Sequence, residues 1–355
     1  MAEKYTNLAV SKKETGVEIT GSIPTEEIAK YRAKALKEFS DSLVIPGFRK
    51  GHIPEKNIID KVGEMNVIEE AAEQALKDIA PEIIEKNAPN FVGRPNVSVT
   101  KLAPGNPVEF KIVVEVLPEF DLPDYKKIAS KEMSAKDEPI EIADKEIDAV
   151  VEEVRKQRAH VAYHQANKDA KDHSHKDEEV EKLKPEFNDE FVKTVGEFKD
   201  VADFRAKVKE NLTKEKEQRG KEKKRGMLLE KLVSETKVAV PQSLVDHELS
   251  RMFSQFESDI AGMGLKVEDY LKHIKKTPED LRKDWAADAL KRAKLNLILD
   301  KIAEKEKIKA EKEEIDNEMK HLLEHYKDAD PVQVALYVNR VLTVEKTIKF
   351  LEEQK

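Results

Sequence analysis

Hydrophobic positions near the N-terminus follow two different periods. Val17, Ile19 and Gly21 lie in a short alternating run, which predicts a strand. After Pro24 the spacing becomes helical, and four apolar positions share one face: Ile28, Tyr31, Ala35 and Phe39. Thr25 is expected to cap this helix, because two glutamates follow it in the first turn. A helix with one apolar face must pack on another element, so this region is predicted to fold as a domain.

The helical period resumes from about Glu55 to Lys86, and Gly63 is expected to break it. Its candidates for burial are Ile58, Ile59, Val62, Ile68, Ala72, Leu76, Ile79 and Ile83. Two strand candidates follow, residues 96–102 and 108–117, joined by the turn-like sequence APGNP. The order strand, helix, loop, helix, strand, strand predicts a small α+β domain over residues 1–118.

Beyond Pro118 the pattern changes. The sequence DLPDYKKIASKEMS is expected to be extended, so residues 119–139 are predicted to be a linker, and residues 140–355 are predicted to be almost entirely helical. The apolar stripes of this part, each of which needs a partner helix, are Leu229, Leu232 and Val233; Val245, Leu249, Met252, Phe253 and Phe256; Leu290, Ala293, Leu297 and Ile298; Ile315, Met319, Leu322 and Tyr326; and Tyr337, Val341, Val344, Ile348 and Leu351.

Short polar turns separate these helices. The predicted breaks are VAVPQS at 238–243, AGMG at 261–264, KTPED at 276–280 and DADP at 328–331. The spacings are irregular, without a fixed repeat. Long helices joined in this way form bundles and arms more readily than a catalytic cleft. The predicted fold class is therefore an α+β N-terminal domain followed by an extended all-α body with helical arms.

Composition narrows the function classes. The 355 residues carry 38% charged side chains and a net charge of −8, so any contact with a polyanion must be local. The absence of cysteine excludes disulfides and thiol catalysis. No apolar run approaches the roughly 20 residues of a membrane span, and the first residues lack the apolar core of a secretory signal. We expect a soluble protein that stays in the cytoplasm and has no membrane partner.

One loop stands out from this helical, charged chain. Residues 46–54 read PGFRKGHIP, with a proline at each end and two glycines that let the chain turn sharply on either side of Phe48, Arg49 and Lys50. An aromatic ring beside an arginine is a common anchor of protein interfaces, and both cations can also meet backbone phosphates. The alternative is that Phe48 folds back into its own domain and the charges are simply solvated.

The sequence IPGFRKGHIPEK resembles the ribosome-docking signature of bacterial trigger factor, G-F-R-x-G-x-x-P. Every fixed position of that signature is present: Gly47, Phe48, Arg49, Gly51 and Pro54. Also similar to that family are FVGRPNVSV, EFKIVVEVLPEF, PEFNDEF (185–191) and KVAVPQSLVDHEL (237–249), in the same order along the chain. The resemblance implies that Phe48, Arg49 and Lys50 dock on the large ribosomal subunit, on protein and rRNA, beside the nascent-chain exit. It also implies a helical body with two arms that cradle emerging polypeptide.

The chain departs from that family in one segment. Most trigger factors carry an FKBP-type prolyl isomerase domain of about a hundred residues between the first body helix (here about residues 140–159) and PEFNDEF. Here only residues 160–184 separate them, without Gly or Pro and with Tyr163 as the one aromatic residue. Such a segment cannot enclose an aromatic pocket. We therefore expect no isomerase activity, and a short polar segment, helical or partly disordered, at this place.

Histidines and a basic run are the remaining candidates for chemistry in the sequence. His160 and His164 have the i, i+4 spacing of a helical metal site, with His173 and His175 nearby, but no further ligand motif accompanies them, so a charged surface segment is the preferred interpretation. No P-loop, Rossmann or GxSxG motif is present. The basic run GKEKKRG (220–226) could attract RNA, although it has the composition of a solvated helix face. We predict no catalytic residue, no metal and no cofactor.

A holder of unfolded chains needs adaptable apolar patches, which methionines and aromatics supply. The candidate client-binding residues are Met252, Phe253, Phe256, Met263 and Leu265 near the AGMG turn, and Tyr326, Val332, Leu336 and Tyr337 around the DADP turn. The alternative for each is a place in the helix–helix core. An empty apolar cradle could also cover itself with a second copy, giving a homodimer. The predicted function is an ATP-independent, ribosome-associated chaperone; the alternatives are a prolyl isomerase with an unrecognised site and a non-ribosomal helical scaffold.

Overall fold

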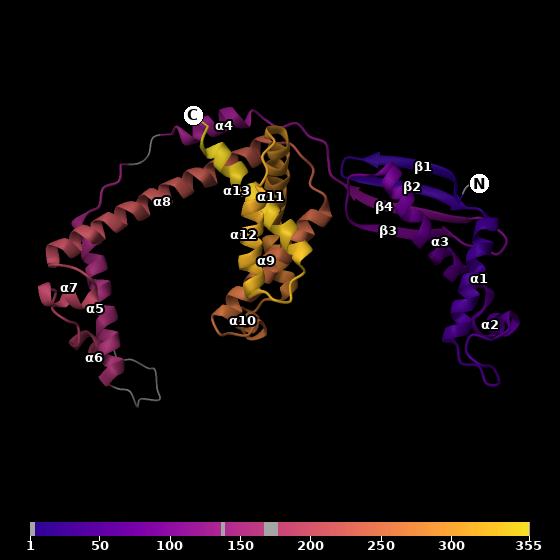
Figure 1. Ribbon diagram of the computed structural model, residues 1–355, viewed down its shortest axis with the longest axis horizontal. Coiled ribbons are helices and arrows are strands. Elements are labelled where there is room, and N and C mark those ends of the chain that lie inside the picture. Colours follow the sequence, from indigo (N-terminus) through magenta and orange to yellow (C-terminus); the bar gives the residue numbers. More distant parts are fainter. Residues whose placement is uncertain (1–3, 136–138, 167–176, 355) are drawn as a thin grey trace. The chain divides into compact units, whose positions relative to one another are not determined.

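The computed structural model in Figure 1 describes residues 4–135, 139–166 and 177–354. Contacts between residues divide the chain into two units. Unit 1 joins Met1–Pro123 to Leu232–Ile348, and unit 2 joins Asp124–Lys231 to Lys349–Lys355. The division falls inside two helices, α8 (Val201–Glu235) and α13 (Pro331–Glu352).

A four-stranded antiparallel sheet forms the N-terminal part of unit 1. Its strands are β1 (Thr6–Lys13), β2 (Gly16–Ile23), β3 (Phe91–Lys101) and β4 (Val108–Val116), in the order β1-β2-β4-β3. Along β2 and β4 every second residue is buried; Ile19, for example, lies opposite Ile112. An antiparallel sheet with one buried and one exposed face produces this alternation.

Helix α3 (Glu64–Asn87) supplies the residues that pack on the buried face. Leu76, Ile79 and Ile83 belong to the same hydrophobic core as Phe110 and Ile112 of β4. Helices α1 (Thr25–Ser42) and α2 (Glu55–Val62) complete this part, and α1 packs against α3. Gly63, with φ of +89°, ends α2 and precedes α3, which confirms the expected break.

Most elements of this part match the sequence pattern, with three differences. Strand β3 begins at Phe91, five residues before the predicted start at Asn96. Strand β1 was not predicted; it is exposed over most of its length, so its pattern carries little alternation. Thr25 does not cap α1, because the N-cap residue is Pro24 and no side chain accepts a hydrogen bond there. The capping prediction was therefore wrong by one position.

The rest of unit 1 is helical and contains α9 (Gln242–Gly262), α10 (Val267–Ile274), α11 (Pro278–Glu306), α12 (Lys312–His325) and the greater part of α13. All four predicted breaks separate helices as expected. Val245 and Leu249 of α9 pack on Ala289 and Ala293 of α11. Leu290, which was expected on that apolar face, is 45% exposed; the neighbouring Ala289 is buried instead. The stripe on α12 is at most half-buried, since no residue of that helix is classed as buried.

Unit 2 contains α4 (Tyr125–Met133), α5 (Asp144–Ala166), α6 (Asp177–Lys182), α7 (Asp189–Val195) and most of α8. Ile147 and Val151 of α5 share a core with Val192 of α7 and with Phe204 and Val208 of α8. The stretch expected to be extended is a helix over Tyr125–Met133, because the Asp124 carboxylate caps it by accepting a hydrogen bond from the Lys127 N–H at 3.1 Å. An α+β N-terminal part and an otherwise helical chain confirm the predicted fold class.

Candidate interaction sites

The loop between α1 and α2 contains two consecutive turns. In the first, the Phe48 N–H donates to the Ile45 carbonyl oxygen at 3.1 Å. Pro46 occupies the second position of this turn, and Gly47, with φ of +89°, occupies the third. Proline followed by a positive-φ glycine is the arrangement that a type II turn requires. The local sequence therefore fixes the direction in which the chain leaves this turn.

The second turn follows at once and is tied to α1. The His52 N–H donates to the Arg49 carbonyl oxygen at 3.0 Å, and Gly51 holds a φ of +81° at the third position. The Gly51 N–H also donates to the Ser40 carbonyl oxygen at 2.8 Å, and the Ile53 N–H donates to Ser40 Oγ at 3.1 Å. Since Ser40 and Ile53 are both buried, these bonds hold the base of the loop in one conformation.

The residues where the two turns meet face solvent. Phe48 is 41% exposed, and Arg49, Lys50 and Pro54 are exposed as well. Within the part of the chain that the structure describes, neither Arg49 nor Lys50 forms an ion pair. The loop thus presents one aromatic ring and two uncompensated cations on an anchored base.

Val44 adds to this exposed tip and was not identified from the sequence. Its side chain is 75% exposed, more than any other large apolar residue in the described ranges. It lies just after α1, four residues before Phe48. The signal was present in the sequence as VIPGF, an apolar pair directly before the turn, but only the structure separates the exposed Val44 from the half-buried Ile45.

The client-binding candidates near the AGMG turn belong to an aromatic cluster. The ring centroid of Phe256 lies 5.7 Å from that of Trp285 and 5.7 Å from that of Tyr270, and Phe253 lies 6.1 Å from Phe256. Met252 packs against the neighbouring α9–α11 core. These side chains are half-buried, so they combine contacts within the helices with a remaining open surface. Trp285 and Tyr270 were missed by the sequence analysis because helices α10 and α11 bring them to α9.

Two further candidates lie free of that cluster. Met263 is 69% exposed and Leu265 is 51% exposed, on the turn between α9 and α10. The bonds of that turn are within its own backbone, where the Leu265 N–H donates to the Ile260 carbonyl oxygen at 3.1 Å. A flexible methionine at such a position can adapt to many apolar partners.

The candidates around the DADP turn are the most exposed set. Tyr326 is 67% exposed, Val332 65%, Leu336 61% and Tyr337 60%. Lys346 of α13 forms an ion pair with Glu314 of α12, at 2.5 Å, which ties the two helices that carry this set. No hydrogen bond, ion pair or ring contact among the described residues joins it to the α9–α11 aromatic cluster. The structure therefore brings the candidates together as two separate groups.

A capping box defines the start of α11, two turns before Trp285. Thr277 Oγ1 accepts from the Asp280 N–H at 3.2 Å, and the Asp280 carboxylate accepts from the Thr277 N–H at 3.0 Å, which makes a capping box. Thr277 Oγ1 also donates to the Asp280 carboxylate at 2.7 Å, and this bond, together with the one from the Thr277 N–H, lowers the pKa of Asp280, since hydrogen bonds to the charged form favour it. The Arg282 guanidinium lies 5.7 Å from the Phe253 ring centroid, so a cation also faces the aromatic cluster.

No group of three or more metal-ligating side chains occurs in the ranges that the structure describes. His160 and His164 lie on α5, whereas His173 and His175 fall outside the described residues. Among the described helices, none has the length and apolarity needed to cross a membrane.

Comparison with known proteins gives concordant results. Residues 6–154 match the model described as bacterial trigger factor protein, and residues 200–354 match the model of its C-terminus. The trigger factor of Finegoldia magna is 27% identical over 97% of this chain and 92% of its own length. That of Carboxydothermus hydrogenoformans is 26% identical over 95% of this chain and 96% of its own length. A solved trigger factor chaperone superposes with a TM-score of 0.54 at 17% identity, covering 98% of this chain and 100% of its own.

Proposed function

The chain belongs to the bacterial trigger factor family and is a ribosome-associated chaperone, and on that premise we propose how its surfaces divide the work. The PGFRKGHIP loop docks on the large ribosomal subunit beside the nascent-chain exit. The helical part holds the emerging polypeptide without ATP. The observation that supports the docking role is the exposed Phe48–Arg49–Lys50 tip on two hydrogen-bonded turns.

The chemistry of the tip suits a mixed surface of protein and rRNA. The Phe48 ring can enter an apolar pocket of a ribosomal protein, while Arg49 and Lys50 meet phosphates or carboxylates. An anchored loop loses little conformational entropy on docking, because its backbone is already fixed. Val44, exposed beside it, extends the apolar part of the contact. If phosphates are involved, binding weakens as the salt concentration rises.

The helical part holds clients through two apolar groups. One comprises Met252, Phe253, Phe256, Met263 and Leu265; the other comprises Tyr326, Val332, Leu336 and Tyr337. Six of these nine side chains are at least half exposed, and the remaining three are half-buried beside Trp285. Small, separate patches give weak contacts that exchange quickly, so a client leaves when its own folding buries its apolar residues. The solved relative is described as a chaperone with promiscuous substrate recognition, which is consistent with this proposal.

This division of work corresponds to a ribosome-binding domain over residues 1–118, a linker over 119–139 and a client-binding domain over 140–355. Docking on translating ribosomes places the protein in the cytoplasm. Away from the ribosome, the exposed apolar groups would be covered by a second copy, giving a homodimer.

We further propose that the chain has no prolyl isomerase activity. Residues 155–199 lie between the two stretches that match the family models. The alignment with the F. magna protein extends over 417 positions, more than the 355 residues of this chain, so the relative has residues without a counterpart here. A short polar segment over 160–184 would occupy the place of the isomerase domain.

Co-sedimentation with 70S ribosomes tests the docking role. Replacing Phe48, Arg49 and Lys50 together by alanine is expected to abolish co-sedimentation and to leave the far-UV circular dichroism unchanged. The matched control replaces Phe91, Arg94 and Lys13, since Phe91 is also 41% exposed and the two cations are exposed in the same domain. Retained ribosome binding by the first variant, or equal loss in both, would refute the docking assignment. It would favour the alternative of a helical scaffold that does not bind ribosomes.

A further inference from the structure

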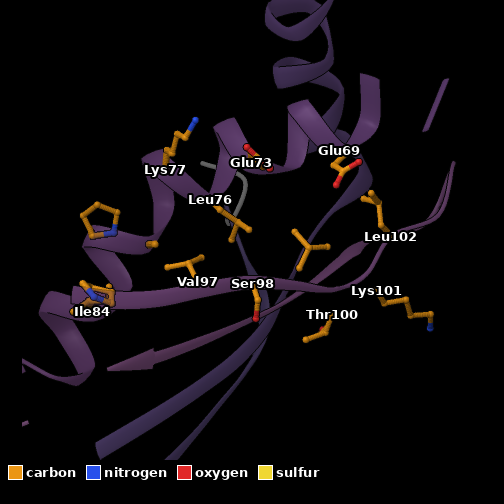
Figure 2. Close-up of a pocket in the computed structure, with 14 residues that line it drawn as sticks. Glu69, Glu73, Leu76, Lys77, Ile84, Val97, Ser98, Thr100, Lys101 and Leu102 are labelled. Atoms are coloured by element: carbon orange, nitrogen blue, oxygen red, sulfur yellow. The ribbon is translucent and has the colours of Figure 1, made fainter. Parts of the chain in front are cut away.

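A groove lies between α3 and β3 in the N-terminal part of the chain, away from the residues assigned above. Its volume is about 750 Å³, within the range of ligand-binding pockets. Leu76, Ala80 and Ile84 line it from α3, and Val97, Val99 and Leu102 line it from the side of β3. Figure 2 shows Val97 directed towards Leu76, whereas Ser98 and Thr100 are directed to the other side of the strand. Apolar side chains therefore line the groove from both sides.

The strand that borders this groove is the edge of the sheet. Among the described residues, β3 pairs with β4 and with no other strand. The alternate backbone N–H and C=O groups of residues 96–100 that point away from β4 consequently have no partner strand. Helix α9 also contacts β3, and Gly93, near the start of the strand, lies close to Ser243 of α9.

Edge strands are usually protected against pairing, and the protecting features of β3 flank one segment of the strand: its register against β4 shifts between Val92 and Asn96 and again between Val99 and Lys101. Arg94 and Pro95 precede the segment Asn96–Thr100, and Lys101 follows it. Within the segment the sequence NVSVT has no charge, no proline and a high β-propensity. An exposed edge with these properties next to an apolar groove is the arrangement that accepts an added strand, whose alternate side chains enter the groove.

The charges around the groove indicate which segments fit. Glu69 and Glu73 of α3 line it, and neither forms an ion pair in the described part of the chain. Lys101 is neutralised by Glu109 at 3.2 Å, and Lys77 is drawn directed away from β3 in Figure 2. The uncompensated charge facing the groove is therefore negative, which complements a basic side chain on the partner.

We propose that the edge of β3 and the groove beside α3 bind an extended, apolar and basic segment of a client polypeptide as an added strand. The proposal rests on the proposed function, because it supplies a further client-binding surface within the ribosome-docking domain. A client would then be held at two kinds of site: the apolar helix surfaces bind side chains alone, whereas this edge also binds backbone.

The test measures binding of a fluorescent nine-residue peptide to the full chain by fluorescence anisotropy. The peptide alternates valine with lysine or threonine. Val97→Asp places a charge in the groove and is expected to weaken binding at least tenfold. The control is Val113→Asp, because Val113 is equally exposed, at 37%, and lies on the opposite face of the sheet. Less than a twofold change is expected for the control. Equal effects of the two substitutions, or none, would overturn the proposal.

Two further arms distinguish strand addition from simple apolar contact. Peptides N-methylated at odd or at even positions lose opposite sets of hydrogen-bond donors, so only one of the two should lose binding. Glu73→Lys should weaken the lysine peptide and strengthen a glutamate analogue. Equal binding of both methylated peptides would exclude an added strand. Concentration-dependent dimerisation that Val97→Asp abolishes, without peptide binding, would assign the edge to a second copy instead.

Ribosome co-sedimentation separates this inference from the proposed function. Val97→Asp is expected to co-sediment with ribosomes as the unaltered chain does, because Val97 lies on β3 and not in the loop between α1 and α2. Unchanged peptide binding by Val97→Asp, with co-sedimentation intact, would refute the groove and leave the proposed function standing. Far-UV circular dichroism and thermal unfolding of both aspartate variants establish that they are folded.

Discussion

At the scale of single residues, the docking loop depends on glycines that hold positive φ. Gly51→Ala should disrupt the loop, because the φ of Gly51 is +81° and an added Cβ would lie 2.8 Å from Asp41 Oδ1. The backbone strain alone is about 1–2 kcal/mol. We expect ribosome affinity to fall about 5- to 30-fold, as the docking conformation becomes less populated. Titrated co-sedimentation measures this change.

A second glycine provides the control. Gly220 lies in α8 with open space around its Cα, so Gly220→Ala should leave ribosome affinity unchanged and stabilise the helix by up to about 1 kcal/mol. Equal affinities for the Gly51→Ala variant and the unaltered chain would mean that the observed loop conformation is not the one that docks.

Tyr31 gives the domain a dependence on alkaline pH. Burial raises the pKa of Tyr31 to about 12, and the hydrogen bond from its hydroxyl to Asp78, at 3.1 Å, acts in the same direction. The folded state thus favours the protonated phenol, so this stabilisation is complete below the ordinary pKa of about 10 and is lost as the pH rises towards about 12. Tyr31→Phe removes that pH dependence.

Urea unfolding at pH 8 and pH 11 tests this assignment. At pH 8 the Tyr31→Phe variant should be less stable by about 1 kcal/mol, the usual net contribution of a hydrogen bond. The difference should shrink at pH 11, because only the unaltered chain loses the Tyr31 contribution. A difference that stays constant between the two pH values would contradict the role given to Tyr31.

At the scale of elements, the capping box of α11 allows a matched comparison. Thr277→Ala should lower the free energy of unfolding by about 1 kcal/mol, because Thr277 accepts a hydrogen bond from the Asp280 N–H. Trp285, the single tryptophan of the chain, lies two turns further along α11 and reports this loss by fluorescence. Thr25→Ala should change stability by only a few tenths of a kcal/mol, since no side chain caps α1. Circular dichroism follows both variants, and equal losses would contradict this difference.

The sequence predicts the ends of elements better than it predicts which of their residues are buried. Breaks carried by Gly, Pro and Asp are local chemistry, so Gly63 and the four turns between the C-terminal helices were predicted correctly. Helix α4 was missed although Asp124, its cap, is a local signal, because only Tyr125, Ile128 and Ala129 are buried and so short an apolar stripe does not mark a helix in the sequence. A choice between adjacent positions, such as Ala289 or Leu290, likewise depends on the helix that packs there.

The candidate site divides in the same way. The loop could be described from sequence because proline and glycine fix its turns within nine residues. The aromatic cluster could not, since Phe256, Tyr270 and Trp285 come from three helices and meet only when these pack. The groove beside β3 also escaped prediction, because the sequence pattern marks a strand but does not state which strand is at the edge.

At the scale of the whole molecule, the open question is whether holding a client also includes isomerising its prolines. FKBP-type catalysis requires a sheet that encloses an aromatic pocket, whereas the described parts of residues 155–199 are helices α5, α6 and α7 with their connecting turns. In proline-limited refolding of a reduced, unfolded protein, we expect the slow phase to keep its rate at catalytic amounts of this chain. The yield should rise instead, because bound intermediates do not aggregate.

An FKBP-type isomerase serves as the positive control in that assay. The variant with Phe48, Arg49 and Lys50 replaced by alanine tests whether the docking loop takes part. The isomerase should accelerate the slow phase without raising the yield at the same concentration. The triple variant should act as the unaltered chain does, since its altered residues dock on ribosomes and the assay contains none. Acceleration by this chain at catalytic amounts would require an isomerase site outside the known fold of that domain. The rate of the slow phase therefore reports isomerase activity, and the yield reports the holding of unfolded chains. Only the holding activity follows from exposed apolar groups on helices.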